Sequence, residues 1–368
     1  MAEIMTTAVK KRDYGLLGPE GKLSAAKGLV SATWYTCPIP RQRLKELMRR
    51  KNGPAIRDTL LWFALLAASG FGGYYYWGTW WCVPFFACYG ALFASTSDSR
   101  WHECGHRTAF KTRWMNDVVY QIASFMVFRE ATSWRWSHAR HHTDTLIVGR
   151  DLEIAVQRPP SILAFCLKFI SLPHAPRELG KLLRHSIGHL TLEDREYVPE
   201  TEYRKMFWEA RAYLVILATF IGLAVWTHSF LPVMYVGLPT FYGAWLQAFF
   251  GLTQHAGLAE DVLDHRLNSR TIYMNPIFRF LYWNMNYHVE HHMFPLVPYH
   301  ALMALHEEMR DDCPRAYSGL IAAYREIIPA VLRQAKDPSY YVTRPLPAAK
   351  RSLDACDSTP AALEGNRA

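Results

Sequence analysis

The amino-acid sequence predicts an all-α integral membrane protein, with four transmembrane helices in two hairpins and a cytosolic helical cap. Three observations lead to this prediction. Two long blocks carry no charged residue, basic residues flank the blocks but are missing from their centres, and helical periodicity returns after the second block. Half of the 368 residues are hydrophobic, and their gathering into blocks favours a membrane protein over two soluble globules.

Residues 1–57 are predicted to form an N-terminal cytosolic or interfacial segment. This stretch has no apolar core followed by a small-residue cleavage site, so no secretory signal peptide is expected and the first span should direct the chain to the membrane. The chain has seven cysteines, an odd number, and none are spaced as CxxC. This pattern argues against a disulfide framework or a zinc ribbon and favours a reducing cytosol.

The two uncharged blocks predict the four spans. The first block has 39 residues between Asp58 and Asp98, and the second has 48 residues between Arg211 and Glu260. A membrane helix needs about 20 apolar residues, so each block is long enough for two helices and a turn. The predicted spans cover about 59–77, 79–97, 212–230 and 233–253, and the Tyr- and Trp-rich turn of the first hairpin is typical of a membrane interface.

The distribution of positive charge predicts the orientation of these spans. Lys and Arg residues precede and follow the first hairpin, whereas both hairpin turns lack them. We therefore expect both termini and the segments outside the spans to be cytoplasmic in a multi-pass protein of the cell inner membrane. The net charge of +9 is explained first by the basic cytoplasmic loops of this topology, so no nucleic-acid partner is predicted. The second interpretation of the positive charge is that it docks an acidic electron carrier.

The remaining segments complete a membrane domain predicted over residues 58–342. Apolar stretches at 118–128 and 161–172 are too short to span and are expected to be interfacial or buried helices. Residues 260–342 show helical periodicity and should form the cytosolic cap. The Pro-, Ala- and Ser-rich residues 343–368 are predicted to be a disordered tail.

Three histidine clusters in the predicted cytoplasmic segments are the strongest functional signal. Residues at i, i+3 and i+4 share one face of a helix, so each cluster should direct two or three imidazoles at one point. One ion cannot take eight ligands, so the clusters predict a histidine-ligated di-metal site in the cap. The clusters are His102 and His106; His138, His141 and His142; and His288, His291 and His292. A ninth candidate, His255, ends the fourth predicted span.

Polar residues inside or beside the clusters are candidates for fixing the histidine tautomers by accepting hydrogen bonds from ring N–H groups. These candidates are Glu103, Asp144, Asp151, Asn284 and Glu290. The other histidines are interpreted as structural or surface residues. They are His174, His185, His189, His228, His265, His300 and His306.

The motifs HECGH, HARHH and HVEHH resemble the three histidine boxes of membrane-bound fatty acid desaturases and related hydroxylases. The similarity covers roughly residues 58–310, and QHAGL around His255 resembles the site of an additional histidine ligand in that family. The resemblance implies a non-haem di-iron centre with two Fe2+ ions, O2 as co-substrate and two electrons per turnover. It implies a desaturase that introduces a C=C bond into an acyl chain or a small aliphatic metabolite.

Two further features refine the resemblance. The sequence flanking the boxes is similar to a bacterial branch that includes rhizopine-type oxygenases and the rhizobitoxine-forming desaturase, which act on small polar metabolites. The HPGG haem motif of a fused cytochrome b5 domain, found in many family members, is missing from this sequence. The resemblance therefore implies a separate electron donor, for which ferredoxin and its reductase are the expected pair.

Three alternatives remain open at this point. A hydroxylase or monooxygenase of the same family shares the first hydrogen removal, and its outcome depends on substrate positioning. His102, Glu103 and His106 also satisfy the HExxH motif of a membrane zinc metalloprotease, although that reading leaves the other two clusters without a role. A metal transporter would place its histidines within the spans, whereas these clusters lie outside the uncharged blocks.

Overall fold

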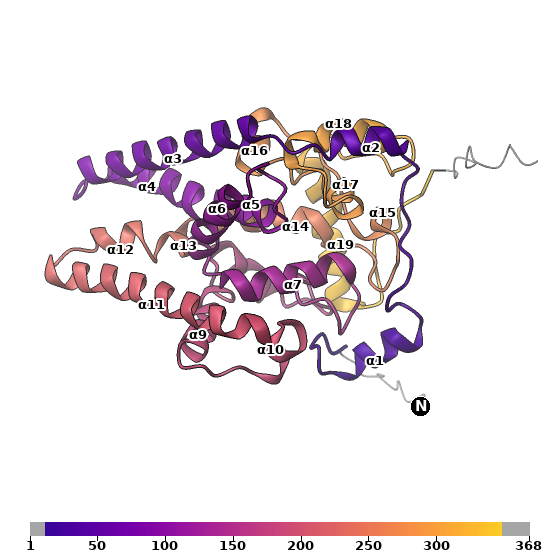
Figure 1. Ribbon diagram of the computed structural model, residues 1–368, viewed down its shortest axis with the longest axis horizontal. Helices are drawn as coiled ribbons and strands as arrows, with labels where there is room; N and C mark the ends of the chain where they lie inside the picture. The colour runs from indigo at the N-terminus through magenta and orange to yellow at the C-terminus, as the bar shows by residue number, and fades with distance from the viewer. Residues whose placement is uncertain (1–11, 348–368) are drawn as a thin grey trace, which may run out of the picture.

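Two helical hairpins joined to a helical cap make up the computed structural model, which describes residues 12–347 (Figure 1). Within these residues the only β-type pairing consists of two isolated bridges, Thr271 with Tyr287 and Ile272 with Tyr317. The all-α prediction is therefore confirmed for the part of the chain that the structure describes.

The first hairpin follows the first uncharged block. Helix α3 spans Asn52–Tyr75 and the returning helix runs without a break through α4 (Cys82–Gly90), a π-helical turn (Ala91–Ser95) and α5 (Thr96–Gly105). The two arms are in close contact near the tip, where a Cβ atom built on Gly72 would lie 2.1 Å from the ring of Phe85. The returning arm thus carries the chain directly from the first hairpin into the HECGH cluster.

The second hairpin is less regular than predicted. Helix α11 spans Tyr203–Trp226, but the predicted fourth span, 233–253, is divided among α12 (Leu231–Tyr235), α13 (Pro239–Tyr242) and α14 (Trp245–His255). The break has a local cause, because Gly237 adopts φ +104° and proline follows at 239. The two hairpins touch beyond this break, where a Cβ atom on Gly243 would lie 1.9 Å from the carbonyl oxygen of Gly90.

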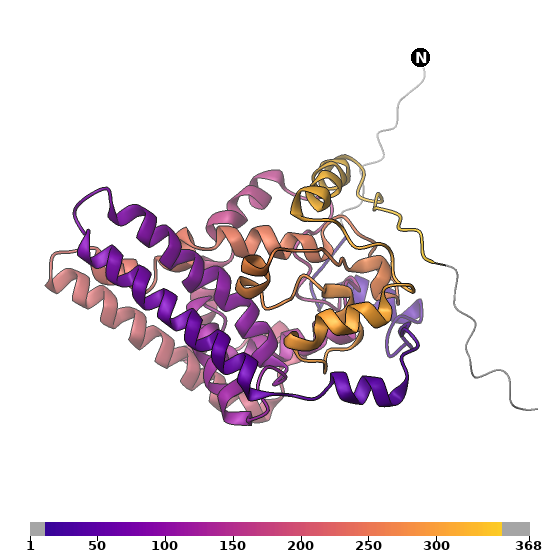
Figure 2. The same ribbon diagram turned by 90° about the horizontal axis from the view of Figure 1, so that it is seen from above.

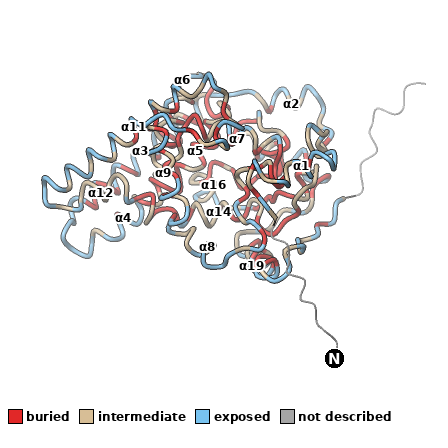
Figure 3. Tube along the Cα trace, turned by 90° about the horizontal axis from the view of Figure 1, so that it is seen from below, coloured by how far each residue is buried: buried red, intermediate tan, exposed pale blue. Residues whose placement is uncertain are grey.

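One helix in the described region, Glu200–Trp226, is long and apolar enough to cross a membrane by length and composition. Helix α3 has 24 residues, but glycines and tyrosines dilute the apolar content of its last turns. The four-span topology therefore stays a prediction. Figure 3 shows that the ends of both hairpins project away from the buried interior with mostly exposed surface.

The central segment forms short helices around the base of the hairpins. They are α6 (Arg113–Met126), α7 (Ala131–Thr143), α8 (Ile162–Leu167), a 3-10 turn (Lys168–Ile170), α9 (Ala175–Ser186), α10 (Leu192–Tyr197) and a second 3-10 turn (Glu200–Glu202). Helix α6 packs on α5, and α9 packs on α11. The 118–128 stretch lies mostly in α6 and the 161–172 stretch in α8 and the following turn.

The cap gathers the two ends of the described chain opposite the hairpin tips (Figures 1 and 2). From the N-terminal side it contains α1 (Pro19–Ala26) and α2 (Arg41–Leu47). From the C-terminal side it contains α15 (His265–Asn268), α16 (Pro276–Leu281), α17 (His288–Met293), a 3-10 turn (Tyr299–Ala301), α18 (Leu302–Met309) and α19 (Leu320–Lys336).

A fully buried arginine ties the first hairpin to the cap. Arg100 in α5 donates to the carbonyl oxygens of Phe280 and Leu281 at the C-terminal end of α16. Its guanidinium also lies 4.8 Å from the ring centroid of Trp283. Because Arg100 precedes His102 by two residues, this contact fixes α5 against the segment that leads to α17.

The ordered chain extends past the predicted start of the tail at residue 343. Arg344 is buried and donates to the carbonyl oxygen of Ser269 at 2.7 Å, and its guanidinium lies 5.5 Å from the Tyr317 ring. This contact corrects the boundary for residues 343–347. The rest of the predicted tail lies outside the described residues.

Candidate metal centre

Four helices bring the predicted histidines to one place in the fold. Helix α5 carries His102, its C-cap residue is His106 four residues on, and α7 supplies the HARHH cluster. Helix α14 ends at His255, and the short helix α17 carries the HVEHH cluster. All nine sequence-predicted histidines fall into two groups in which the ring nitrogens of each group lie within 4.8 Å of one another.

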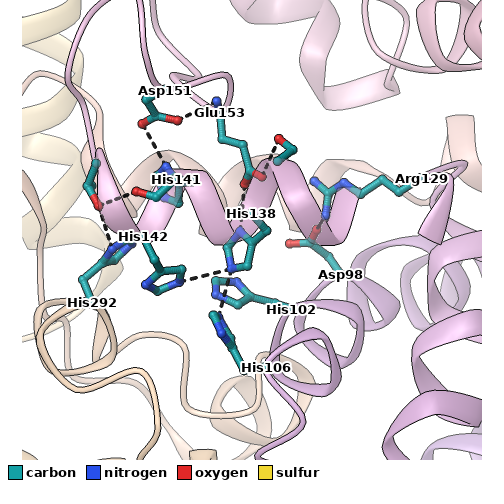
Figure 4. Close-up of polar contacts among 12 residues, drawn as sticks. Asp98, His102, His106, Arg129, His138, His141, His142, Asp151, Glu153 and His292 are labelled. Carbon is teal, nitrogen blue, oxygen red and sulfur yellow. Dashed lines mark hydrogen bonds and ion pairs between the residues drawn. The ribbon is translucent and has the colours of Figure 1, made fainter. Parts of the chain in front are cut away.

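The first group contains five histidines, His102, His106, His138, His142 and His291. Their Nε2 atoms converge, with separations of 2.7 Å between His102 and His291, and 3.1 Å between His106 and His138. The Nε2 atom of His142 lies 3.2 Å from those of both His138 and His291. Figure 4 shows the labelled members of this group turned toward one another from α5 and α7.

The second group contains four histidines, His141, His255, His288 and His292. The Nε2 atom of His288 lies 2.9 Å from that of His255 and 3.0 Å from that of His292. The two groups are adjacent, because the rings of His142 and His292 are stacked with centroids 4.4 Å apart. Two neighbouring ions would therefore have separate sets of imidazoles.

Acceptors behind the rings fix the tautomer of four of these histidines. The Nδ1 atom of His138 faces Glu153 at 3.0 Å, and that of His141 faces Asp151 at 2.8 Å. The Nδ1 atom of His255 faces the carbonyl oxygen of Asn268 at 2.7 Å. Since carboxylates and carbonyls only accept, Nδ1 carries the proton in all three and Nε2 presents its lone pair to the centre.

The fourth case, His292, follows from a shared hydroxyl. Thr145 donates its hydroxyl proton to the carbonyl oxygen of His141 at 2.7 Å, so its oxygen accepts from Nδ1 of His292 at 3.1 Å. Both Nε2 lone pairs, those of His255 and His292, therefore point at Nε2 of His288. A single N–H on His288 could donate to only one of these two lone pairs, whereas a cation among the three rings could bind all three Nε2 atoms. The donor set fits a metal ion.

Burial keeps most of these imidazoles neutral, which is the form that binds metal. Desolvation, reinforced by the neighbouring imidazoles, lowers the pKa of seven of the nine histidines well below 6.5. Burial also opposes protonation of His141, but the carboxylate of Asp151 raises the pKa of this ring above its ordinary value. Asp151 thus supplies negative charge beside the second group.

Of the five polar residues predicted to orient the ligands, only Asp151 contacts one of the nine histidines in the described structure. Glu103 accepts from the hydroxyl of Thr108 and the backbone N–H of Tyr299. Asp144 pairs with Arg150, and Asn284 donates to the carbonyl oxygen of Tyr299. Glu290 accepts from Thr271 and contacts His306. Glu103 and Glu290 lie on the same helices as candidate ligands, but their side chains point away from the metal centre, whereas Asp144 and Asn284 lie outside the helices.

The residues that hold the ring nitrogens were mostly missed by sequence reasoning. Glu153, Thr145 and Asn268 lie outside the boxes, and no spacing rule connects them to a particular histidine. The other seven histidines of the chain lie outside these two groups and differ in their surroundings. For example, His185 is buried between Glu130 and Asp194, whereas His189 is exposed.

A cavity of about 330 Å³ opens beside the two groups. Members of both groups line it, namely His102, His138, His141, His255 and His288. The remaining wall combines apolar side chains, such as Leu146, Leu152, Ile154, Val156, Leu252 and Leu258, with a few polar ones, including Asp98, Arg129 and Gln247. Arg129 forms an ion pair with Asp98, and Gln247 donates to the same carboxylate at 3.0 Å. A molecule in this cavity lies next to both candidate ion positions.

Comparisons with known proteins agree with this geometry. The family model described as "Fatty acid desaturase" matches residues 78–324. The chain is 23% identical over 286 residues to the "sn-1 oleoyl-lipid 12-desaturase" of Synechocystis sp., covering 73% of this chain and 79% of that protein. It is 36% identical over 87 residues to "Omega-6 fatty acid desaturase, endoplasmic reticulum isozyme 1" of Glycine max, covering 24% of this chain and 22% of the relative.

A third relative is the "Delta(12) acyl-lipid conjugase (11E,13E-forming)" of Momordica charantia, which is 27% identical over 168 residues, or 43% of this chain and 40% of that protein. The aligned part thus spans about a fifth of the soybean protein and most of the cyanobacterial one. The family model covers more than half of the chain and includes all nine histidines. The chain belongs to the fatty acid desaturase family.

Proposed function

We propose that this protein is a membrane-bound, oxygen-dependent desaturase that introduces a C=C bond into the acyl chain of a lipid. The observation that carries the proposal is the cavity, whose wall contains histidines from both groups. A substrate carbon placed there is next to both candidate ion positions, as hydrogen removal at a bound metal requires.

In this proposal all nine histidines are iron ligands. His102, His106, His138, His142 and His291 hold one Fe2+ ion, and His141, His255, His288 and His292 hold the other. When bound, the two ions supply the activation of O2 against an unactivated C–H bond. Glu153, Asp151, Thr145 and the carbonyl of Asn268 keep the rings in the tautomer that binds metal.

The substrate class is supported by the relatives and by the cavity wall. The relatives are named for acyl-lipid substrates, and the apolar side chains of the cavity suit an aliphatic chain. The resemblance to the bacterial branch makes a small aliphatic metabolite the second candidate. Product analysis also separates desaturation from hydroxylation, because only the hydroxylated product gains an oxygen atom.

The position of Glu103 disfavours the zinc protease alternative. In the HExxH mechanism this carboxylate activates a metal-bound water. Here Glu103 accepts hydrogen bonds from Thr108 and from the backbone of Tyr299, and it does not line the cavity. A five-histidine set also exceeds the four ligands of a typical zinc site.

We further propose that the hairpins enter the bilayer of the cell inner membrane as four spans, with the metal centre and both termini in the cytoplasm. The family is membrane-associated, and large apolar side chains are exposed on both hairpins, including Leu60, Phe71, Val215 and Ile221. Exposed Trp80 and Trp226 near the tips suit the far interface. A separate carrier, ferredoxin with its reductase, would supply the electrons.

Metal analysis and product analysis test the proposal together. The protein purified from iron-supplied cells is expected to contain two irons, and cells that also express ferredoxin and its reductase should accumulate an unsaturated acyl lipid. Mass spectrometry of the lipids identifies the product and the bond position. One zinc and no iron, or unchanged lipid and metabolite profiles from an iron-loaded protein, would reject the proposed function.

A further inference from the structure

The candidate metal centre lies inside the fold, so electrons from another protein must cross part of the chain to reach it. Each of the nine histidines is buried or half-buried. Electron tunnelling weakens more steeply across empty space than through packed groups, which makes rings in contact a favourable path. Two rows of aromatic rings in the described structure reach the histidine groups.

The first row runs from the surface to the four-histidine group. The indole of Trp34 stacks on His265 with ring centroids 4.3 Å apart and planes 7° apart. The His265 ring in turn lies 5.2 Å from the ring of His292. Trp34 is half-buried, and exposed Thr33 and Thr36 flank it. A single buried imidazole therefore separates a surface indole from a candidate iron ligand.

The second row ends at the wall of the cavity. Trp134 contacts Trp101 with centroids 5.7 Å apart, and Trp101 lies 5.2 Å from His138. Both tryptophans line the cavity of about 330 Å³, and Arg129 lies over both rings. A protein carrier cannot enter a space of that size, so this row offers no docking point.

The surface around Trp34 has the charge and position that a carrier needs. The segment between α1 and α2 runs along the end of the molecule opposite the hairpin tips, which is the proposed cytoplasmic face (Figure 1). Exposed basic residues lie on both sides of this segment, and none of them forms an ion pair within residues 12–347. They are Lys22, Arg41, Lys45, Arg49, Arg50 and Lys51. This surface complements an acidic partner.

We propose that an acidic one-electron carrier of the iron–sulfur class docks over the α1–α2 segment and that electrons enter through Trp34 and His265 to the ion held by the His292 group. The inference rests on the proposed function, because it needs a redox-active iron pair. Each carrier is oxidised by one electron as one iron(III) is reduced to iron(II). Two docking events therefore deliver the two electrons of a turnover.

The test follows the carrier and not product formation. Iron-loaded full-length protein in the oxidised state is mixed without oxygen with a reduced plant-type [2Fe–2S] ferredoxin, and oxidation of the ferredoxin is followed by its visible spectrum. Trp34→Leu should slow this transfer by an order of magnitude, and Trp34→Phe should retain most of the rate because a ring remains. Trp114→Leu, which removes another exposed indole, should transfer at the wild-type rate.

Two further measurements separate the route from damage to the site. Reduction by methyl viologen radical, a small reductant, should be equally fast in wild type and Trp34→Leu, and both should hold two irons. The double change Arg41→Gln with Lys45→Gln should raise the ferredoxin concentration needed for half-maximal rate without lowering the maximal rate.

Three results would overturn the proposal. Equal transfer rates in wild type and Trp34→Leu would reject the relay. Slower transfer in Trp134→Phe but not in Trp34→Leu would place electron entry at the cavity. An iron-loaded wild type that the ferredoxin fails to reduce would reject the acidic carrier. A wild type that takes up no iron would instead reject the proposed function itself.

Discussion

Replacement of Glu153 by Ala is expected to weaken iron binding by the five-histidine group. The Glu153 carboxylate faces Nδ1 of His138 at 3.0 Å and accepts from the hydroxyl of Ser137 at 3.1 Å, and its side chain is 14% exposed. Losing such an outer partner typically lowers metal affinity by about 10- to 100-fold. That loss equals about 1.4 to 2.7 kcal/mol. It agrees with the roughly 1.5 to 3 kcal/mol that a hydrogen bond to a charged group contributes.

Equilibrium dialysis against Fe2+ measures this effect as weaker binding of one of the two ions. Glu153→Gln should bind more tightly than Glu153→Ala, because its amide oxygen still accepts from His138 and its amide N–H can face the rotatable Ser137 hydroxyl. Asp144→Ala is the matched control, since Asp144 is a buried carboxylate two residues after His142 whose partner is Arg150 and not a histidine. Wild-type iron affinity in Glu153→Ala, or an equal loss in Asp144→Ala, would refute the assignment of Glu153.

Three other predictions follow from the same geometry. In a metal assay, His255→Ala should retain one iron, and this variant should lose turnover. The control His189→Ala, a change at an exposed histidine, should keep two irons. Two irons in both variants would show that His255 is not a ligand. Truncation after Thr343 should lower the unfolding temperature, because it removes Arg344 and its buried hydrogen bonds, each contributing on the order of 1 kcal/mol. The single change Arg344→Ala should reproduce most of this decrease. Burial and the neighbouring imidazoles lower the pKa of seven histidines below 6.5, so the unfolded chain binds more protons than the folded chain as the pH falls. Thermal melts of the metal-free protein should therefore show a loss of stability below about pH 6.5. An unfolding temperature that does not change in that range would contradict this prediction.

The sequence predicted the candidate site more completely than the helices that support it. All nine predicted histidines meet in two groups, because spacing of i, i+3 and i+4 places side chains on one helix face whatever the fold. The hairpins were predicted from uncharged blocks, but hydropathy could not show that the fourth span divides at Gly237 and the following proline. That break depends on the backbone conformation of Gly237, which a hydropathy pattern does not record.

The partners of the ring nitrogens were decided by the tertiary structure alone. Glu103, Asp144 and Glu290 lie close to the clusters in sequence, but a helix sends neighbouring side chains in different directions, and their hydrogen bonds are made elsewhere. Glu153 and Asn268 reach their histidines only because the loop after α7 and the short helix α15 lie against α7 and α14.

By itself, then, the sequence determined the all-α class, the histidine ligand candidates and their grouping into clusters, since these depend on local periodicity and residue chemistry. Which histidines share an ion, which residues hold their Nδ1 atoms and where Trp34 meets His265 depend on contacts between distant segments. Such contacts are set by packing and by the pairing of buried polar groups, which no local pattern in a chain records.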